Sequence, residues 1–161
     1  MKPKKLNKVL IALDYDPTAK KVAEVGFSFA KSMKAEVILL HVIADTTYYS
    51  AIEYSPIVGF LGISEPEVSE FTTSGGLEKA IKHYLEKMKN LLGDDSIETI
   101  VKEGLFADVI LATAISEHAD VIVMGSHSRG WLAEILMGSV TEKVLKNTTK
   151  PLLIIPIKKH D

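Results

Sequence analysis

Short apolar runs alternate along this chain with amphipathic segments of helix length, and that alternation constrains the fold more than any other feature. The apolar runs span Lys8–Asp14, Ala35–Ile43, Ile97–Gly104, Asp120–Gly125 and Pro151–Pro156. Between them, apolar residues recur at helical spacing over residues 17–33, 77–92, 106–119 and 139–147. Strands that alternate with single helices indicate a parallel sheet with right-handed crossover connections.

We therefore predict an α/β fold, with one doubly wound domain over residues 1–161. Its five-stranded parallel sheet is expected to have the strand order 3-2-1-4-5, with helices on both faces. Residues 44–76 have no sustained period and contain two prolines and four glycines, so we expect a long insertion after the second strand. Its tyrosine cluster, which includes Tyr48, Tyr49 and Tyr54, is a candidate lid over a ligand or a candidate surface for a partner.

Local signals mark several helix ends. Asp16 and Pro17 are a candidate N-cap and first residue of the helix that follows the first strand. Gly93 is expected at the C′ position of the helix that ends near residue 92. Ser139 and Glu142 have the spacing of a capping box at the start of the last helix.

Composition and motifs exclude several classes of function. The formal net charge of −2 leaves no basic excess for a nucleic-acid partner. No stretch approaches the roughly 20 apolar residues of a membrane span. The chain has no cysteine, which excludes disulfides and thiol chemistry and favours a cytoplasmic location. The glycine-rich dinucleotide motif, the P-loop, the G-x-S-x-G elbow and the histidine spacing of metal sites are all missing.

The segment after the fourth apolar run has the residue types that hold an anion. Gly125, Gly130 and Gly138 allow the backbone to turn its N–H groups inward, and the start of a helix adds more of them. Further donors are the hydroxyl and guanidinium groups of Ser126, Ser128, Arg129, Ser139 and Thr141. Four or five such hydrogen bonds support binding of a polyphosphate at roughly −7 to −8 kcal/mol, which is micromolar affinity. The alternative is that these residues only turn the chain and cap the helix.

The sequence resembles the universal stress protein family over almost the whole chain. Nucleotide-binding members of that family carry the motif G-x2-G-x9-G-[ST] after the fourth strand. Here Gly125 is its first residue and Gly138-Ser139 its end, with the nine-residue gap intact. The stretches KVLIALD, VILLHVI, VIVMGSHS, ILMGSVTEKVL and KPLLIIP are also similar to the family. Ser128 departs from the motif because it stands at the second glycine. If that position needs positive φ, serine costs about 1–2 kcal/mol, or about tenfold in affinity.

The resemblance implies binding of an adenine nucleotide, ATP, ADP or AMP, with Mg²⁺ as a candidate companion ion. Ser128 favours AMP or ADP over ATP. The adenine and ribose are expected near Asp14 and the backbone of Ala12 and Val42, and the phosphates near the amides that follow Gly138. The candidate binding residues are Ala12, Asp14, Val42, Met124, Gly125, Ser126, His127, Ser128, Arg129, Gly130, Gly138, Ser139, Val140 and Thr141. For His127, a solvent-facing place in the loop is the alternative interpretation.

The resemblance also implies a homodimer joined by antiparallel pairing of the last strand, Pro151–Pro156. An exposed apolar edge favours such pairing in its own right. We expect a cytoplasmic regulatory protein of the stress response, not an enzyme, whose contacts with an unknown protein partner change when nucleotide binds. Two alternatives are open. One is a nucleotide-free dimeric interaction module of the same fold. The other is a slow ATP hydrolase, for which no general base beside the phosphates is evident.

Overall fold

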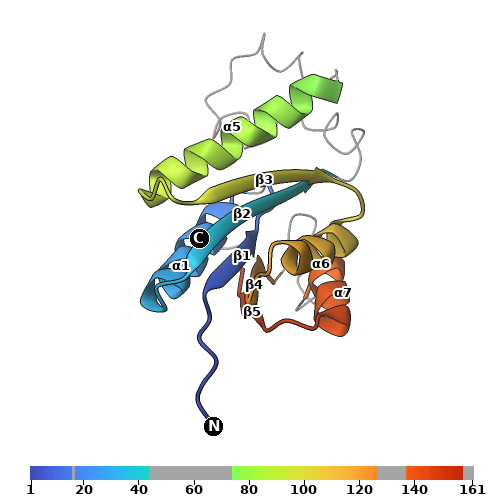
Figure 1. The fold of residues 1–161 in the computed structure, drawn as a ribbon. Helices are drawn as coiled ribbons and strands as arrows, with labels where there is room; N and C mark the ends of the chain where they lie inside the picture. Colours follow the sequence, from blue (N-terminus) through green and yellow to red (C-terminus); the bar gives the residue numbers. More distant parts are fainter. Residues whose placement is uncertain (16, 44–73, 127–136, 158–161) are drawn as a thin grey trace.

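The computed structural model describes residues 1–15, 17–43, 74–126 and 137–157 and contains the predicted parallel sheet. In chain order the elements are β1 (Lys8–Ala12), α1 (Ala19–Ser32), β2 (Glu36–Ile43), α5 (Ser74–Leu92), β3 (Glu98–Glu103), α6 (Phe106–Ser116), β4 (Val121–Gly125), α7 (Ser139–Asn147) and β5 (Leu152–Ile155). The five strands run parallel in the order β3-β2-β1-β4-β5 (Figure 1). The predicted fold class and strand order are therefore confirmed.

The register of the central strand, β1, determines which residues meet at the carboxyl edge of the sheet. Ala12 lies opposite Leu40 of β2, and Ile11 lies opposite Val123 of β4. Because β1 and β4 are neighbours and run in the same direction, the chain segments that follow them leave the sheet side by side. The candidate site residues that the structure describes lie along this edge.

Helices cover both faces of the sheet and enclose two apolar layers. Figure 1 shows α1 on one face, with α6 and α7 on the other. Val9 and Ile11 of β1 join the layer under α1 and α5, whereas Leu10 joins the layer under α6 and α7. All three side chains are fully buried. This double burial explains why the central strands β1 and β4 are nearly continuous apolar runs instead of alternating with polar residues.

Two helices begin at different residues from those predicted. The N-cap of α1 is Thr18, so Pro17 precedes the helix in a turn and its predicted place as first helical residue was wrong. Asp16, the predicted N-cap, lies outside the described residues. Helix α5 begins at Ser74, three residues before the predicted start. Residues 74–76, predicted as the end of the insertion at 44–76, therefore belong to the helix. Residues 44–73 lie outside the described residues.

Helix α6 ends at Ser116, before the predicted end at residue 119. His118 adopts a positive φ of 56°, and the N–H of Ala119 donates to the carbonyl of Ala114 at 2.9 Å. This is a Schellman motif in which histidine takes the place usually held by glycine, so no glycine marks the end in the sequence. After α5, by contrast, Gly93 has the predicted C′ position, with φ of 71°. Across the described ranges, no helix combines the length and apolar character needed to cross a membrane.

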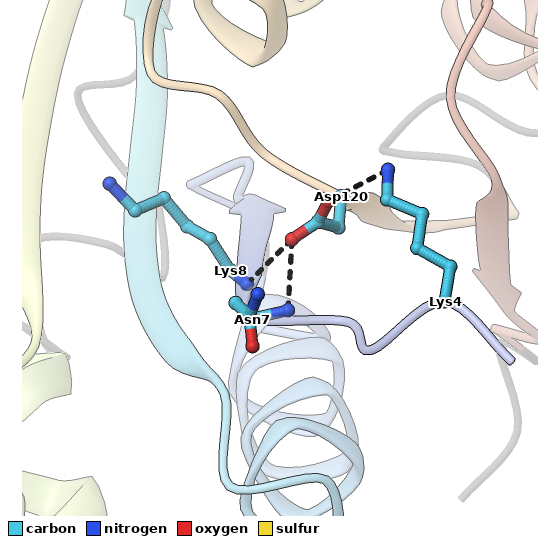
Figure 2. A network of polar contacts seen from close by, with 4 residues as sticks. All are labelled: Lys4, Asn7, Lys8 and Asp120. Carbon is cyan, nitrogen blue, oxygen red and sulfur yellow. Dashed lines mark hydrogen bonds and ion pairs between the residues drawn. The ribbon is translucent and has the colours of Figure 1, made fainter. Parts of the chain in front are cut away.

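At the opposite, amino edge of the sheet, Asp120 joins the starts of β4 and β1 (Figure 2). One carboxylate oxygen accepts hydrogen bonds from the backbone N–H groups of Asn7 at 2.8 Å and Lys8 at 3.1 Å. The other oxygen lies 3.2 Å from Nζ of Lys4. These contacts, above all the hydrogen bond from Asn7, lower the pKa of Asp120. Asp120 therefore fixes the sheet at the edge away from the candidate site.

Candidate functional site

The carboxyl ends of β1 and β4 meet at the point where the strand order reverses. β1 leads through α1 to β2 on one side, and β4 leads through α7 to β5 on the other. The two connections run over opposite faces of the sheet, because α1 and α7 pack against different apolar layers. The crevice between such diverging connections is the usual ligand site of an open α/β sheet.

The chain turns away from the sheet just after β1. Ala12 is the last residue of the strand, and the N–H of Leu13 extends the pairing to the carbonyl of Leu40 at 2.8 Å. Asp14 is half-buried, and its Oδ1 accepts a hydrogen bond from the N–H of Tyr15 at 2.7 Å. Asp14 therefore lies at the predicted edge, with one carboxylate oxygen bonded inside its own turn.

Val42 contributes its backbone, not its side chain, to this edge. The side chain is 5% exposed and belongs to the apolar layer under α6 and α7. The carbonyl of Leu40 faces β1, because it accepts the N–H of Leu13. Backbone groups alternate sides along a strand, so those of Val42 face the same side, level with the turn that follows β1.

Two buried polar side chains support that turn, and sequence reasoning identified neither. Nδ1 of His41 lies 2.8 Å from the carbonyl oxygen of Leu13. The hydroxyl of Tyr84 donates to the carbonyl of Asp14, also at 2.8 Å. Burial lowers the pKa of His41 from its usual 6.5 to about 4, although the bond to Leu13 opposes this effect. A histidine within the apolar run of β2 was an available signal, whereas nothing in the spacing of α5 distinguished Tyr84 from its apolar neighbours.

Ser126 anchors three segments just beyond the end of β4. Its N–H donates to the carbonyl of Ile155 at 2.9 Å, and its carbonyl accepts from the N–H of Gly138 at 2.7 Å. Its Oγ accepts from the N–H of Ile157 at 2.9 Å. The Ser126 hydroxyl, a candidate ligand donor in the sequence, thus holds the segment after β5. Met124, two residues earlier, is 5% exposed and packs under α6 and α7.

Contacts with β4 orient the first turn of α7. Gly138 is the N-cap, and its carbonyl accepts the first helical hydrogen bond from the N–H of Glu142 at 2.9 Å. Oγ1 of Thr141 donates to the carbonyl of Gly125 at 2.9 Å. The capping-box interpretation of Ser139 was wrong, because this residue is the first of the helix and no side chain caps the helix. Its side chain is exposed at the helix start.

The start of α7 offers several donors to a ligand. An α-helix leaves the N–H groups of its first residues without acceptors inside the helix, and here these are the groups of Ser139, Val140 and Thr141. The helix dipole adds partial positive charge at the same end. The arrangement is chemically suited to an anion such as a phosphate group.

Several candidate residues lie outside the described residues. They are His127, Ser128, Arg129 and Gly130 of the glycine-rich segment, together with the tyrosines of residues 44–73. Their predicted roles stay predictions, and so does the effect of serine at the second motif position.

The strand order and the crevice at its switch point define a doubly wound α/β protein with a candidate anion site. A sequence model described as the universal stress protein family matches residues 5–156. The chain therefore belongs to the universal stress protein family, as the resemblance predicted.

Individual relatives agree with this assignment. The chain is 35% identical over 156 residues to universal stress protein MJ0577 of Methanocaldococcus jannaschii, covering 94% of this chain and 95% of the relative. The solved structure of hypothetical protein MJ0577 matches with a TM-score of 0.70 and 31% identity, over 98% of this chain and all (100%) of that one. A universal stress protein solved in complex with cAMP shares the fold, with a TM-score of 0.59 and 17% identity over 94% of this chain and 98% of that one.

Proposed function

We propose that this universal stress protein binds an adenine nucleotide (ATP, ADP or AMP) between the carboxyl ends of β1 and β4. The observation that carries the proposal is the orientation of α7, because hydrogen bonds join the start of this helix to the end of β4. Thr141 donates to the carbonyl of Gly125 at 2.9 Å, and Gly138 donates to that of Ser126 at 2.7 Å. These bonds support a phosphate site at the helix N-terminus. The universal stress protein solved with cAMP holds a ligand of the same chemical class, an adenosine phosphate.

In this proposal the base and ribose lie toward β1 and β2. The backbone groups of Ala12 and Val42 contact the base, and the carboxylate of Asp14 accepts a ribose hydroxyl. A carboxylate has about four acceptor positions, so the 2.7 Å bond from Tyr15 is compatible with this role. Mg²⁺ would partly neutralise the phosphates and is tested as a separate variable.

Isothermal titration calorimetry with ATP, ADP and AMP, each with and without Mg²⁺, tests the nucleotide proposal. We expect a dissociation constant on the order of 1–10 μM for at least one nucleotide. Gly138→Val and Ser139→Val should each abolish the heat, because both place a branched side chain at the start of α7. Ser28→Val is the matched control, since Ser28 is an exposed serine on α1. It should bind like the wild type.

A protein that gives no heat with any nucleotide would contradict the proposal. That result would support the nucleotide-free dimeric module instead. We propose that the protein is not an enzyme, so phosphate release from ATP should not exceed a heat-killed control. Faster release would favour the slow hydrolase.

We further propose a homodimer joined through β5. The sheet has two edge strands, and they differ in character. β3 ends in exposed charged residues, Lys102 and Glu103, which discourage pairing with another strand. β5 is entirely apolar, and its first three residues, Leu152 to Ile154, are only partly buried. A second copy of β5 would cover them.

The pairing within the sheet shows which backbone groups of β5 a partner strand can use. The carbonyl of Pro151 accepts from Ile122 of β4, and that of Ile155 accepts from Ser126 just beyond β4. Residues 152 and 154 therefore direct their backbone groups to the open edge. Ile154→Pro removes an outward N–H without removing a bond to β4. We expect this variant to be monomeric in sedimentation experiments, whereas Ile154→Val should remain dimeric. A dimeric proline variant would contradict the proposed interface.

The regulatory role rests on the same site. Bound nucleotide is proposed to shift the population of surface conformations that a protein partner recognises. The cytoplasmic location stays a prediction from the sequence.

A further inference from the structure

Two polar side chains from different elements end on consecutive carbonyl groups of the turn after β1. His41 comes from β2 and lies 2.8 Å from the carbonyl of Leu13. Tyr84 comes from α5 and donates to the carbonyl of Asp14 at 2.8 Å. The two rings contact each other edge to face, with centroids 6.4 Å apart and an interplanar angle of 84°. His41 and Tyr84, which contact each other, thus both hydrogen-bond to the backbone of this turn.

The bond at Leu13 defines the protonation of His41. A carbonyl oxygen only accepts hydrogen bonds, so Nδ1 carries the hydrogen and the neutral ring is the Nδ1–H tautomer. His41 is 1% exposed, and alternation along β2 places it on the same face as Leu39 and Ile43, which belong to the apolar layer under α1 and α5. An imidazole in such surroundings requires a hydrogen-bond partner to offset its desolvation, and the Leu13 carbonyl is that partner.

These bonds fix the part of the chain that carries Asp14. The N–H of Leu13 is bonded to Leu40 at 2.8 Å, so His41 completes the bonding of both backbone groups of Leu13. Tyr84 holds the next carbonyl, and Oδ1 of Asp14 is bonded to the N–H of Tyr15. The position of the Asp14 carboxylate therefore depends on a backbone held by His41 and Tyr84.

We propose that His41 and Tyr84 are positioning residues of the nucleotide site, which hold the Leu13–Asp14 backbone where Asp14 and its neighbours meet the base and ribose. This inference rests on the proposed adenine-nucleotide function. It has a specific consequence: the two residues act on the nucleoside end of the ligand, so their loss weakens AMP and ATP binding by the same factor. Changes at the start of α7 act on the phosphates and weaken ATP more than AMP.

Three variants test the proposal by calorimetry with AMP and ATP. Tyr84→Phe removes one oxygen atom, and His41→Phe removes the donor to Leu13 while keeping a ring. Each phenylalanine variant should lower the affinity for both nucleotides by about fivefold to tenfold, because one hydrogen bond is lost. His41→Asn should restore most of the affinity, because its amide nitrogen lies close to the position of Nδ1 and donates in the same direction.

A stability control and a second readout separate positioning from general destabilisation. Asp120→Ala disturbs the far edge of the sheet and should keep wild-type affinity despite its lower stability. Amide hydrogen exchange reports on the turn directly, with no nucleotide present. The amides of Leu13 and Tyr15 should exchange faster in His41→Phe and Tyr84→Phe than in the wild type, and at nearly the wild-type rate in His41→Asn.

The outcomes distinguish this inference from the proposed function. If the wild type binds nucleotide and both phenylalanine variants bind it equally well, the positioning role is overturned while the function stands. If the losses differ between AMP and ATP, the assignment to the nucleoside end is overturned. If the wild type binds no nucleotide, the proposed function fails and the inference falls with it, whatever the exchange rates show of the turn itself.

Discussion

Lowering the pH from 7 to 4 should destabilise this protein by about 3 kcal/mol through one side chain, His41. Burial disfavours the charged imidazolium and holds the pKa of His41 at about 4 in the folded protein, against a usual 6.5. Between these two values the unfolded chain binds a proton that the folded protein does not. The free energy of unfolding therefore falls as the pH drops from 6.5 to 4. At about 1.4 kcal/mol for each pH unit, this interval gives about 3.5 kcal/mol, and half-protonation of the folded histidine at pH 4 reduces the loss to about 3 kcal/mol.

Two carboxylates of the described residues, Asp94 and Asp120, have lowered pKa values and act in a different pH range. Hydrogen bonds hold the pKa of Asp94 and Asp120 below their usual 3.8, chiefly through Lys31 for Asp94 and through the N–H of Asn7 for Asp120. Their stabilising contributions are present above pH 3.8 and are lost only as the pH falls below it. The range from pH 6.5 to 4 therefore separates His41 from these two carboxylates.

Urea unfolding followed by circular dichroism at several pH values between 7 and 4 provides the measurement. His41→Asn is the comparison, because asparagine keeps a donor for Leu13 and does not titrate. The wild type should lose about 3 kcal/mol more than the variant over this range. The difference between the two slopes matters, not the stability of the variant at pH 7. Equal slopes would refute the argument that His41 is held neutral by burial.

Six further substitutions test the fold around the site and at the opposite edge, each by urea unfolding. Asp120→Ala should cost about 1–3 kcal/mol, because two backbone N–H groups at the start of β1 lose a charged acceptor at 2.8 and 3.1 Å. Asp120→Asn, which keeps an acceptor, should cost less. Gly104→Ala should cost about 2–4 kcal/mol, since φ is 140° there and the new Cβ would lie 2.6 Å from a valine methyl of α6. Gly93→Ala, at φ of 71° in open space, should cost only about 1 kcal/mol. Thr141→Val should cost about 1–2 kcal/mol through the lost 2.9 Å bond to β4. Ser139→Ala should change stability by less than about 0.5 kcal/mol, and a loss near 1 kcal/mol would revive the capping box.

Elements with a strong local pattern were predicted well. The run from Ala35 to Ile43 is apolar on both faces, and the structure has β2 there. Gly93 ends α5 where a glycine was expected. The C′ position needs only a backbone with positive φ, which glycine adopts most easily, so the sequence alone was enough to predict it. The misses occurred at helix ends, where the residue in the role was not the one with the strongest local signal. His118 ends α6 at a positive φ of 56°, and Thr18, not Asp16, precedes the first residue of α1.

The candidate site was located by topology and only partly by residue type. A carboxylate after β1 and glycines after β4 were visible in the sequence, and the strand order brings them to one edge. The role of Ser126 was not visible, since its hydroxyl could equally serve a ligand or the protein. In the structure it accepts the N–H of Ile157, 31 residues away. Ser139 shows the reverse case, because a capping signal was present but the side chain is exposed and caps nothing.

The order of amino acids determined by itself which segments are strands and which are helices, because apolar periodicity is a property of neighbouring residues. It thereby determined the parallel sheet and the family. Only the tertiary structure decided which polar groups support the site, since each such contact joins distant residues. His41 meets Leu13 across 28 residues, and Tyr84 meets Asp14 across 70. Those partners exist only once the two apolar layers have packed and water has been excluded, so no local pattern could have revealed them.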